Sequence, residues 1–280
     1  MPTPEIPQFF SDPLTAAGLT VLVAQAGAYS LYWFLGDRAH RERAMEGFEH
    51  VILSGVLFGI ALILINLSLW GLNVYLDLAG VKPPPGGAIK TLNQTKGWWD
   101  FGANVQAALR VAEGTYRSYV GKAWGILEGY MAAVIGTGIL PWTSPVSMAI
   151  MNGLAYIVTA ATTILISAAV YAVAAAMAYS WPALLPVGAV LVTYERTRNL
   201  GAWLLALSVV APVVLSAGAD VLRSAVNPNT LPTLLTATPS GAVPLIQAMV
   251  LLGLIGLVLS VASYAASRLF DHAGAHLALD

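Results

Sequence analysis

Three charged residues lie at a joint between two apolar stretches of the sequence. The stretch LLPVGAVLVTYERTRNLGAWLLALSVVAPVV covers residues 184–214, with Glu195, Arg196 and Arg198 near its centre. Glu195 and Arg198 are three residues apart, a spacing at which opposite charges can pair locally. Two arginines at a membrane surface also fix orientation through their positive charge. The pattern predicts a turn at a membrane interface.

A second group of charged residues belongs to a predicted amphipathic helix in the 100–122 region. Its apolar face repeats at steps of three and four residues, and a polar stripe lies opposite. Such a helix either lies flat on a membrane or lines an aqueous path with its polar stripe. The apolar face comprises Val105, Leu109, Ala112, Tyr116, Val120 and Ala123, and the polar stripe comprises Gln106, Arg110, Glu113 and Arg117.

Further charges lie near predicted membrane depth, where an ionised side chain usually faces a cavity or a partner. Glu128 lies inside a predicted span. We leave open both alternatives, that its side chain lines a polar interior and that it does not. Asp77 and Asp220 lie near predicted span ends, where interfacial water favours solvated carboxylates. The candidate polar path consists of Arg110, Arg117, Lys122 and Glu128.

The sequence offers little for catalysis or metal binding. It has no cysteine, and its four histidines lie in polar segments or at span ends, so an intramembrane serine nucleophile would have no histidine base. HExxH and the phosphate-binding GxxxxGK[ST] motif are both absent. His272 and His276 are four residues apart but are more typical of a polar tail than of a metal site. We therefore predict a protein that is not an enzyme and has no catalytic, cofactor or metal residues.

Composition indicates a multi-pass protein of the cell membrane, with the lipid bilayer as its main partner. The chain is 58% hydrophobic and 10% charged, with a mean hydropathy of +0.73, whereas a soluble domain is about 25% charged. Residues 129–194 and 224–267 contain no Asp, Glu, Lys or Arg. Each run far exceeds the roughly 20 residues that span a bilayer. The net charge of −1 gives no global basic field.

The predicted fold is all-α, a single transmembrane domain over residues 1–280 with six or seven crossings. Residues 1–12 and 271–280 form its tails, and residues 80–123 form a polar loop with the amphipathic helix. VKPPPGG (81–87) and SWPALLP (180–186) are expected to interrupt helices. Residues 184–192 then either complete a crossing that starts near Ala168 or dip into the membrane and return. The clearer spans are 14–35, 51–72, 124–140, 200–222 and 245–270.

Two further expectations concern helix packing and sidedness. The amphipathic helix is expected to continue into the 124–140 span, where Gly121, Gly125 and Gly129 form a face that packs against another helix or another subunit. With six crossings, the distribution of Lys and Arg favours both termini inside and places residues 37–50 opposite residues 194–199. With seven crossings the distribution indicates nothing.

The joint also resembles one membrane family. PALLPVGAVLV, which contains Pro186 and Gly188, leads to Glu195 and the Arg196–Arg198 turn, then to Gly201, Trp203 and a Leu/Ala-rich span with Pro212. This arrangement, over residues 182–214, resembles the TrbL-like polytopic subunits of type IV secretion and conjugation machines. It looks closer still to the membrane subunit of the archaeal DNA-exchange (Ced) import system.

The resemblance implies a non-enzymatic channel or scaffold subunit of a DNA-transfer apparatus. A separate cytoplasmic ATPase would drive the DNA, and pilin-like small membrane proteins or further copies of the chain would complete the complex. Two alternatives remain open: a small-solute or ion transporter with a broken-helix site near Pro182 and Pro186, and a structural anchor for a pilus or secretion assembly.

Overall fold

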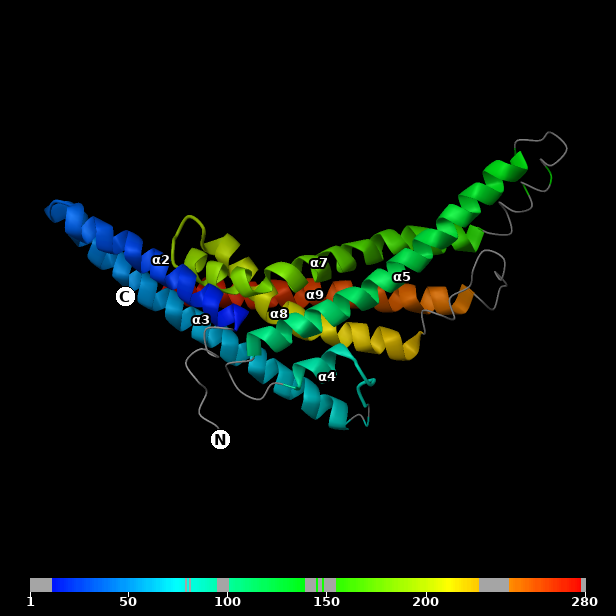
Figure 1. The fold of residues 1–280 in the computed structure, drawn as a ribbon, viewed down its shortest axis with the longest axis horizontal. Helices are drawn as coiled ribbons and strands as arrows, with labels where there is room; N and C mark the ends of the chain where they lie inside the picture. The colour runs from blue at the N-terminus through cyan, green and yellow to red at the C-terminus, as the bar shows by residue number, and fades with distance from the viewer. Residues whose placement is uncertain are drawn as a thin grey trace.

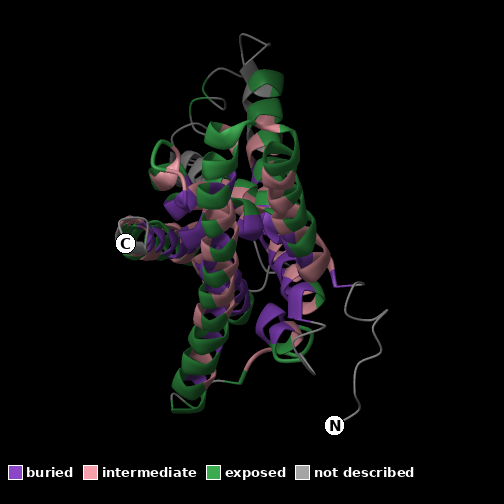
Figure 2. Cartoon of the chain, turned by 90° about the vertical axis from the view of Figure 1, so that its left-hand side faces the viewer, coloured by how far each residue is buried: buried purple, intermediate pink, exposed green. Residues whose placement is uncertain are grey.

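The computed structural model describes residues 12–78, 80, 82–94, 101–138, 145, 148, 155–226 and 242–277. Every regular element in these ranges is a helix (Figure 1), which confirms the predicted all-α class. Buried positions lie on inward helix faces, while outward faces are exposed along most of their length (Figure 2). The elements are α2 Pro13–Leu35, α3 Arg38–Leu78, α4 Ala88–Leu92, α5 Phe101–Gly138, α7 Ala155–Val192, α8 Arg198–Ala225 and α9 Ala242–Leu277.

Helices α2 and α3 form a long antiparallel hairpin that projects from the rest of the molecule (Figure 1). The charged segment 37–50 consists of the turn and the first turns of α3 itself, which is 41 residues long. Arg38 Nε lies 3.5 Å from Glu42 Oε1, so the opposite charges at this spacing do pair. Such an exposed pair contributes little to stability.

The start of α2 is tied to the start of α5 by one carboxylate. Asp12 is 3% exposed, and its Oδ2 accepts hydrogen bonds from the backbone N and the hydroxyl of Thr15, at 3.1 and 3.2 Å. Its Oδ1 accepts a bond from the Ala103 backbone N at 2.8 Å. A Cβ at Gly102 would come within 2.6 Å of this carboxylate, so the close approach requires glycine. Asp12 thus caps two helices that are distant in sequence.

Helices α7, α8 and α9 run side by side through the centre of the molecule (Figure 1). The expected break at residues 180–186 is wrong, because α7 continues through Pro182 and Pro186 to Val192. Both prolines are buried against neighbouring helices. Away from water, a broken helix would leave backbone groups without partners, so continuation is favoured. The segment Ser167–Thr193 is long and apolar enough to cross a membrane, which is compatible with the alternative in which residues 184–192 complete a crossing from near Ala168.

Helix α5 extends over 38 residues, which confirms that the 100–122 helix continues into the next apolar segment. Its inner face packs on α7 and α8. The ring centroid of Phe101 lies 6.5 Å from that of Trp181, and the Tyr116 hydroxyl donates to the Leu215 carbonyl at 2.8 Å. The Tyr119 hydroxyl donates to the carbonyls of Leu222 and Val226 near the end of α8.

Part of the predicted polar loop docks on the helix bundle as α4. The backbone N–H groups of Ala88 and Ile89 donate to the two carboxylate oxygens of Asp220 on α8, each at 2.9 Å. A Cβ at Gly87 would approach this carboxylate within 2.6 Å. Asp220 is 4% exposed, so its predicted solvation at a span end is wrong. The carboxylate is buried because two backbone donors satisfy it.

Five helices of the described chain are long and apolar enough to cross a membrane. They support a multi-pass α-helical membrane protein. Helix α5 is not among them, since Arg110, Glu113, Arg117, Lys122 and Glu128 interrupt its apolar windows. The five are Pro13–Leu35, Arg38–Leu78, Ser167–Thr193, Arg198–Ala225 and Val243–Ala275.

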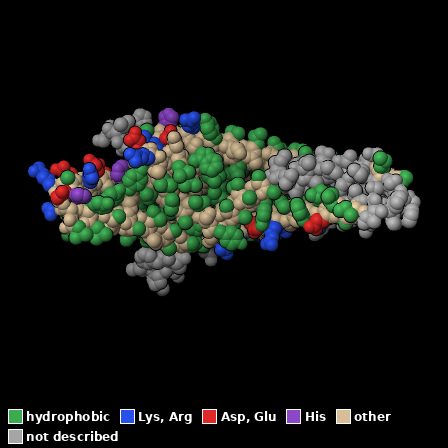
Figure 3. Space-filling view, turned by 90° about the horizontal axis from the view of Figure 1, so that it is seen from above, with side chains coloured by type: hydrophobic (Ala, Val, Ile, Leu, Met, Phe, Trp, Pro, Cys, Tyr) green, Lys and Arg blue, Asp and Glu red, His purple; other side chains and the backbone are tan. Residues whose placement is uncertain are grey.

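Three turns or helix ends meet at the same end of the bundle. Tyr194 of the joint contacts Tyr29 on α2 and His50 on α3, and Gly274 of α9 packs against Val192. Charged side chains gather toward this end, while hydrophobic side chains cover the middle of the view (Figure 3). The predicted opposite placement of residues 37–50 and 194–199 is therefore wrong. It counted residues 124–140 as a full crossing and residues 80–123 as a loop, whereas α5, which contains the span, begins beside Trp181, inside the bundle.

Candidate functional site: the outer face of α5 and the α7–α8 joint

Three of the four candidate path residues share one face of α5. Arg110, Arg117 and Glu128 are separated by 7 and 11 residues, steps that return to nearly the same side of a helix. All three are exposed, and the Arg110 side chain reaches the exposed ring of Tyr179 on α7. Lys122 is also exposed but lies about a third of a turn around the helix. We call the surface formed by Arg110, Arg117, Trp124 and Glu128 the α5 polar face.

Arg110 stands beside the middle of an apolar helix. Its guanidinium carbon lies 6.0 Å from the ring centroid of Tyr179, a cation–π contact. Tyr179 is near the centre of the apolar segment Ser167–Thr193 and is 71% exposed. A guanidinium at this depth costs several kcal/mol if it faces lipid. The contact therefore places a cation beside the middle of an apolar helix.

The far end of the α5 polar face carries the opposite charge. Trp124 Nε1 donates a hydrogen bond to Glu128 Oε1 at 2.5 Å, one turn along the helix. Both side chains are exposed. The bond orients the carboxylate along the helix surface and presents the indole ring beside it. The polar face thus combines cations, an acid and an aromatic ring, so its potential is only weakly positive.

Two of the three glycines in the predicted packing face lie in open space among the described residues. A Cβ added at Gly121 or Gly125 would meet nothing within 4 Å, and Gly129 is half-buried. Both open glycines adjoin the α5 polar face. Both partners expected for this face, another helix and another subunit, therefore stay predictions.

Glycines of the joint instead bring α7 and α8 into backbone contact. A Cβ at Gly188 would lie 2.9 Å from the Leu205 backbone N, and one at Gly201 would overlap the backbone of Leu191 and Val192. Small residues permit such close approach in lipid. Gly188 and Gly201 thus have a packing role in this fold. The alternative of a transporter site near Pro182 and Pro186 required a broken helix, and α7 is continuous there.

Pro212 has a partner that sequence reasoning missed. A proline has no N–H, so Pro212 leaves the carbonyl four residues earlier, that of Ser208, without its intrahelical donor. The indole Nε1 of Trp181 donates to this carbonyl at 2.7 Å, and Trp181 is fully buried. The sequence did contain one indication of this bond: Trp181 lies in an apolar segment, and a buried indole N–H needs a hydrogen-bond acceptor.

Two of the three charges of the joint point outward. Glu195 and Arg196 are exposed, as is Trp203 on the outer side of α8. Arg198 is half-buried, and its Nε finds no hydrogen-bond acceptor among the described residues. Glu195 and Arg198 form no ion pair in the described part of the chain.

Tyr194, which sequence reasoning passed over, is the residue that ties the joint to the α2–α3 hairpin. Its hydroxyl lies 2.6 Å from the Tyr29 hydroxyl and accepts a hydrogen bond from Gln25 Nε2 at 3.0 Å. Its ring centroid is 5.1 Å from that of His50. Gln25 and Tyr29, four residues apart on apolar α2, were the signal available in the sequence.

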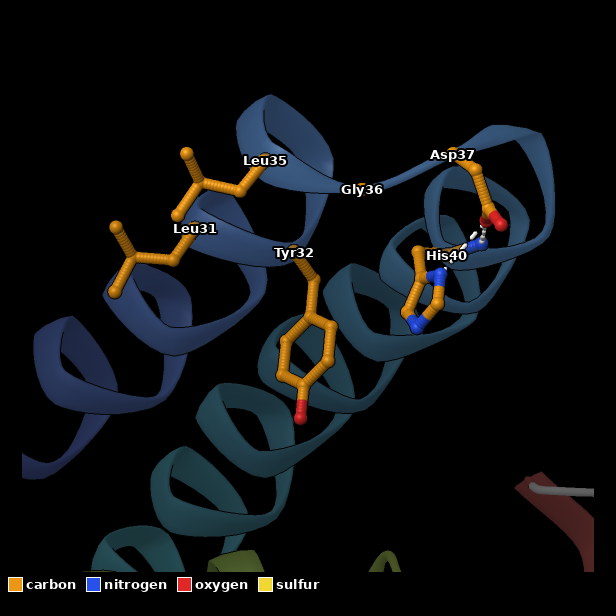
Figure 4. Close-up of a pocket in the computed structure, with 6 residues that line it drawn as sticks. All are labelled: Leu31, Tyr32, Leu35, Gly36, Asp37 and His40. Atoms are coloured by element: carbon orange, nitrogen blue, oxygen red, sulfur yellow. Dashed lines mark hydrogen bonds and ion pairs between the residues drawn. The ribbon is translucent and has the colours of Figure 1, made fainter.

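A hollow of about 370 Å³ lies at the tip of the α2–α3 hairpin, lined by Leu31, Tyr32, Leu35, Gly36, Asp37 and His40 (Figure 4). Asp37 Oδ1 accepts a hydrogen bond from the His40 backbone N at 3.0 Å and lies 2.7 Å from His40 Nδ1. The side-chain hydrogen bond with His40 lowers the pKa of Asp37. Asp37 is therefore the N-cap of α3, and this capping role explains why Asp37 and His40 lie in contact.

Comparison with protein families, with curated proteins and with solved structures gives no match for this chain.

Proposed function

We propose that this chain is a membrane-embedded channel or scaffold subunit of a DNA-transfer apparatus, of the import or conjugation type. It works with a separate cytoplasmic ATPase and with pilin-like small membrane proteins, either as one copy in that complex or as a homo-oligomer. The proposal rests on the resemblance over residues 182–214. The structural observation that carries it is Arg110 at mid-span, on an outer face that the chain itself leaves uncovered.

The argument starts from the cost of facing lipid. Arg110, Arg117 and Glu128 lie on a face exposed in the single chain, and Arg110 stands beside the centre of an apolar span. Charges at such depth face cavities or partners. When neighbouring subunits cover the rest of α5, its polar face lines a shared aqueous path. We therefore count α5 as a sixth membrane helix, amphipathic over residues 101–122, that enters the bundle without crossing it completely.

The chemistry of the path suits a moving polyanion. Arg110, Arg117 and Lys122 attract phosphates, while Glu128 limits the net attraction. Each additional phosphate contact adds salt-sensitive affinity, and a strongly basic channel would hold DNA rather than pass it. DNA is accordingly a transported substrate that makes weak contacts along this face.

The test is DNA transfer in cells that carry the double variant Arg110→Ala with Arg117→Ala. We expect transfer to fall at least tenfold while the amount of protein in the membrane stays constant, because both side chains are exposed and neither stabilises the fold through buried contacts. Arg110→Lys with Arg117→Lys retains the charge and should keep most of the activity.

A matched control removes the same charge elsewhere. Arg41 and Arg43 are exposed on the α2–α3 hairpin, away from α5. Arg41→Ala with Arg43→Ala should leave transfer unchanged. Normal transfer by the α5 double variant would overturn the proposal.

A further inference from the structure

An uncharged polar side chain on α3 faces outward within a long apolar segment. Asn66 is exposed and belongs to the stretch between Glu49 and Asp77, which contains no Asp, Glu, Lys or Arg. At 1.5 Å per residue, it lies roughly 25 Å from the first of these charges and roughly 16 Å from the second. Its Nδ2 donates to the Leu62 carbonyl of the same helix at 2.9 Å. Within the described structure, its Oδ1 accepts no hydrogen bond.

The surface around Asn66 permits close approach of another helix. Gly59 and Gly55 precede Asn66 by 7 and 11 residues, so all three lie on one side of α3. A Cβ at either glycine would meet nothing within 4 Å, which leaves an open groove along the helix. We call this surface the α3 outer face, formed by Ile52, Gly55, Gly59, Ile63, Asn66 and Trp70, of which the four larger side chains are exposed.

Lipid does not satisfy this face. Acyl chains offer no hydrogen-bond partner for a carboxamide, and each unsatisfied polar group in hydrocarbon is costly. The same helix shows how such a group is satisfied one heptad later. Asn73 and Asn93 donate to each other's Oδ1 at 3.0 and 2.8 Å, a reciprocal amide pair.

We propose that the α3 outer face binds the same face of a second copy of this chain, with the two Asn66 side chains paired across a two-fold axis. A carboxamide carries both donor and acceptor, so it is its own complement and selects an identical partner at the same depth. The axis runs along the membrane normal, because both copies insert with the same orientation, and the two α3 helices are parallel. Gly55 and Gly59 let the helix backbones approach closely enough for the amides to meet.

The face carries no charge that would recruit an ionic partner. Its complementarity is therefore limited to shape and one amide. An Asn within an apolar helix seam is also a known determinant of helix pairing, since only one register satisfies it. This interface lies on α3 and does not depend on the DNA-transfer proposal, which rests on α5.

The experiment measures energy transfer between labelled copies of the full chain in liposomes at varied protein-to-lipid ratios. The chain has no cysteine, so Arg38→Cys, at a position 95% exposed, gives a single labelling site. We expect a concentration-dependent dimer. Asn66→Leu should weaken it about 3- to 20-fold, the range for an interhelical hydrogen bond in lipid. Asn66→Gln, which keeps the amide, should weaken it less.

A matched glycine pair separates the α3 outer face from general effects on the helix. Gly59→Leu fills the groove and should weaken the dimer by at least tenfold. Gly71→Leu makes the same change at an exposed, open position about 140° around the helix and should leave the dimer unchanged. Leucine is a better helix former than glycine, so neither change opposes folding of α3.

Three results would overturn the proposed dimer through the α3 outer face. They are a monomer at every protein-to-lipid ratio, full dimer affinity in both Asn66→Leu and Gly59→Leu, or a loss of dimer affinity in Gly71→Leu equal to that in Gly59→Leu. Arg110→Ala with Arg117→Ala should leave the energy transfer unchanged. Loss of the dimer in that variant would place the interface on α5 and would also overturn the pair. Failure of the α3 interface is thus distinguishable from failure of the α5 path.

Discussion

At the residue scale, a single indole compensates for a proline. Pro212 removes one backbone donor from α8, and Trp181 on α7 supplies another to the same Ser208 carbonyl. The two residues are far apart in sequence, and no local pattern links them. The bond fixes the register of α7 against α8, because only one position of the indole reaches that carbonyl.

A double-mutant cycle tests this compensation. Trp181→Phe keeps most of the ring volume but leaves a buried carbonyl unsatisfied, which costs about 1–3 kcal/mol of unfolding free energy. In the Pro212→Ala background, the alanine N–H takes over as donor, so the same substitution should cost less by about 1 kcal/mol. Reversible denaturant unfolding in detergent measures all four proteins. Equal costs in both backgrounds would show that the indole acts only through its volume.

Asp220 gives a second prediction at this scale. Asp220→Asn replaces one acceptor oxygen with an amide donor that faces a backbone N–H, so α4 should lose its anchor at a cost of about 1–3 kcal/mol. Limited proteolysis in detergent should then cut within residues 82–94 faster than in the unaltered protein. Asp77→Asn is the control, since Asp77 is exposed. Equal cleavage of the two variants would contradict the anchoring role.

At the element scale, the glycines separate into those that pack within the chain and those that do not. Gly188 and Gly201 hold α7 and α8 in backbone contact, whereas Gly121 and Gly125 of α5 face open space. All four were noted in the sequence, but the sequence does not show which of them meet another helix. The distinction depends on which helix lies opposite, and that is set by the whole fold.

Alanine substitution separates the two kinds of glycine. Gly201→Ala should destabilise the solubilised protein by about 1–3 kcal/mol, because its methyl group overlaps the backbone of α7. Gly125→Ala should stabilise it by up to about 1 kcal/mol through helix propensity alone. Thermal unfolding of the detergent-solubilised monomer measures both. A loss in Gly125→Ala equal to that in Gly201→Ala would mean that α5 packs more closely within the chain than described.

Helix limits were partly predictable from the sequence. The apolar periods and the Pro-Pro-Pro-Gly-Gly segment correctly placed α2, the apolar part of α3, α8 and α9. Pro182 and Pro186 led to the wrong prediction of a helix break. Helix propensities measured in water overstate the effect of proline in a helix that is surrounded by other helices. Asp12 and Asp220 were also beyond prediction as caps, since their backbone partners lie 91 and 132 residues away.

At the scale of the whole molecule, the sequence indicated helices suited to a membrane but not which segments between helices lie at the same end of the bundle. Long uncharged runs correctly indicate helices suited to a membrane. The sidedness failed because α5 starts beside Trp181 rather than at a surface, and a count of apolar runs does not show where a helix begins in depth. Of the candidate site, the sequence identified the charged residues of α5, but the contact of Arg110 with Tyr179 required the fold.

Chemical labelling tests the corrected arrangement. Single cysteines at Arg41 and Glu195 should react with a membrane-impermeant maleimide from the same side, because the hairpin and the joint share one end of the bundle. A cysteine at Ser224, exposed at the other end of α8, should react only from the opposite side. Labelling of intact and of permeabilised cells distinguishes the two sides. Opposite sidedness of Arg41 and Glu195 would restore the six-crossing arrangement.

The carboxylate shared by α2 and α5 has a consequence for biosynthesis. Asp12 accepts hydrogen bonds from Thr15, which is synthesised three residues later, and from Ala103, which is synthesised 91 residues later. The first helix can therefore enter the bilayer early, but its final depth is locked only after the nascent chain has grown past that second donor. Until then Thr15 is the only partner of the Asp12 carboxylate among those described above, and the contact that ties the start of α2 to α5 is not yet made.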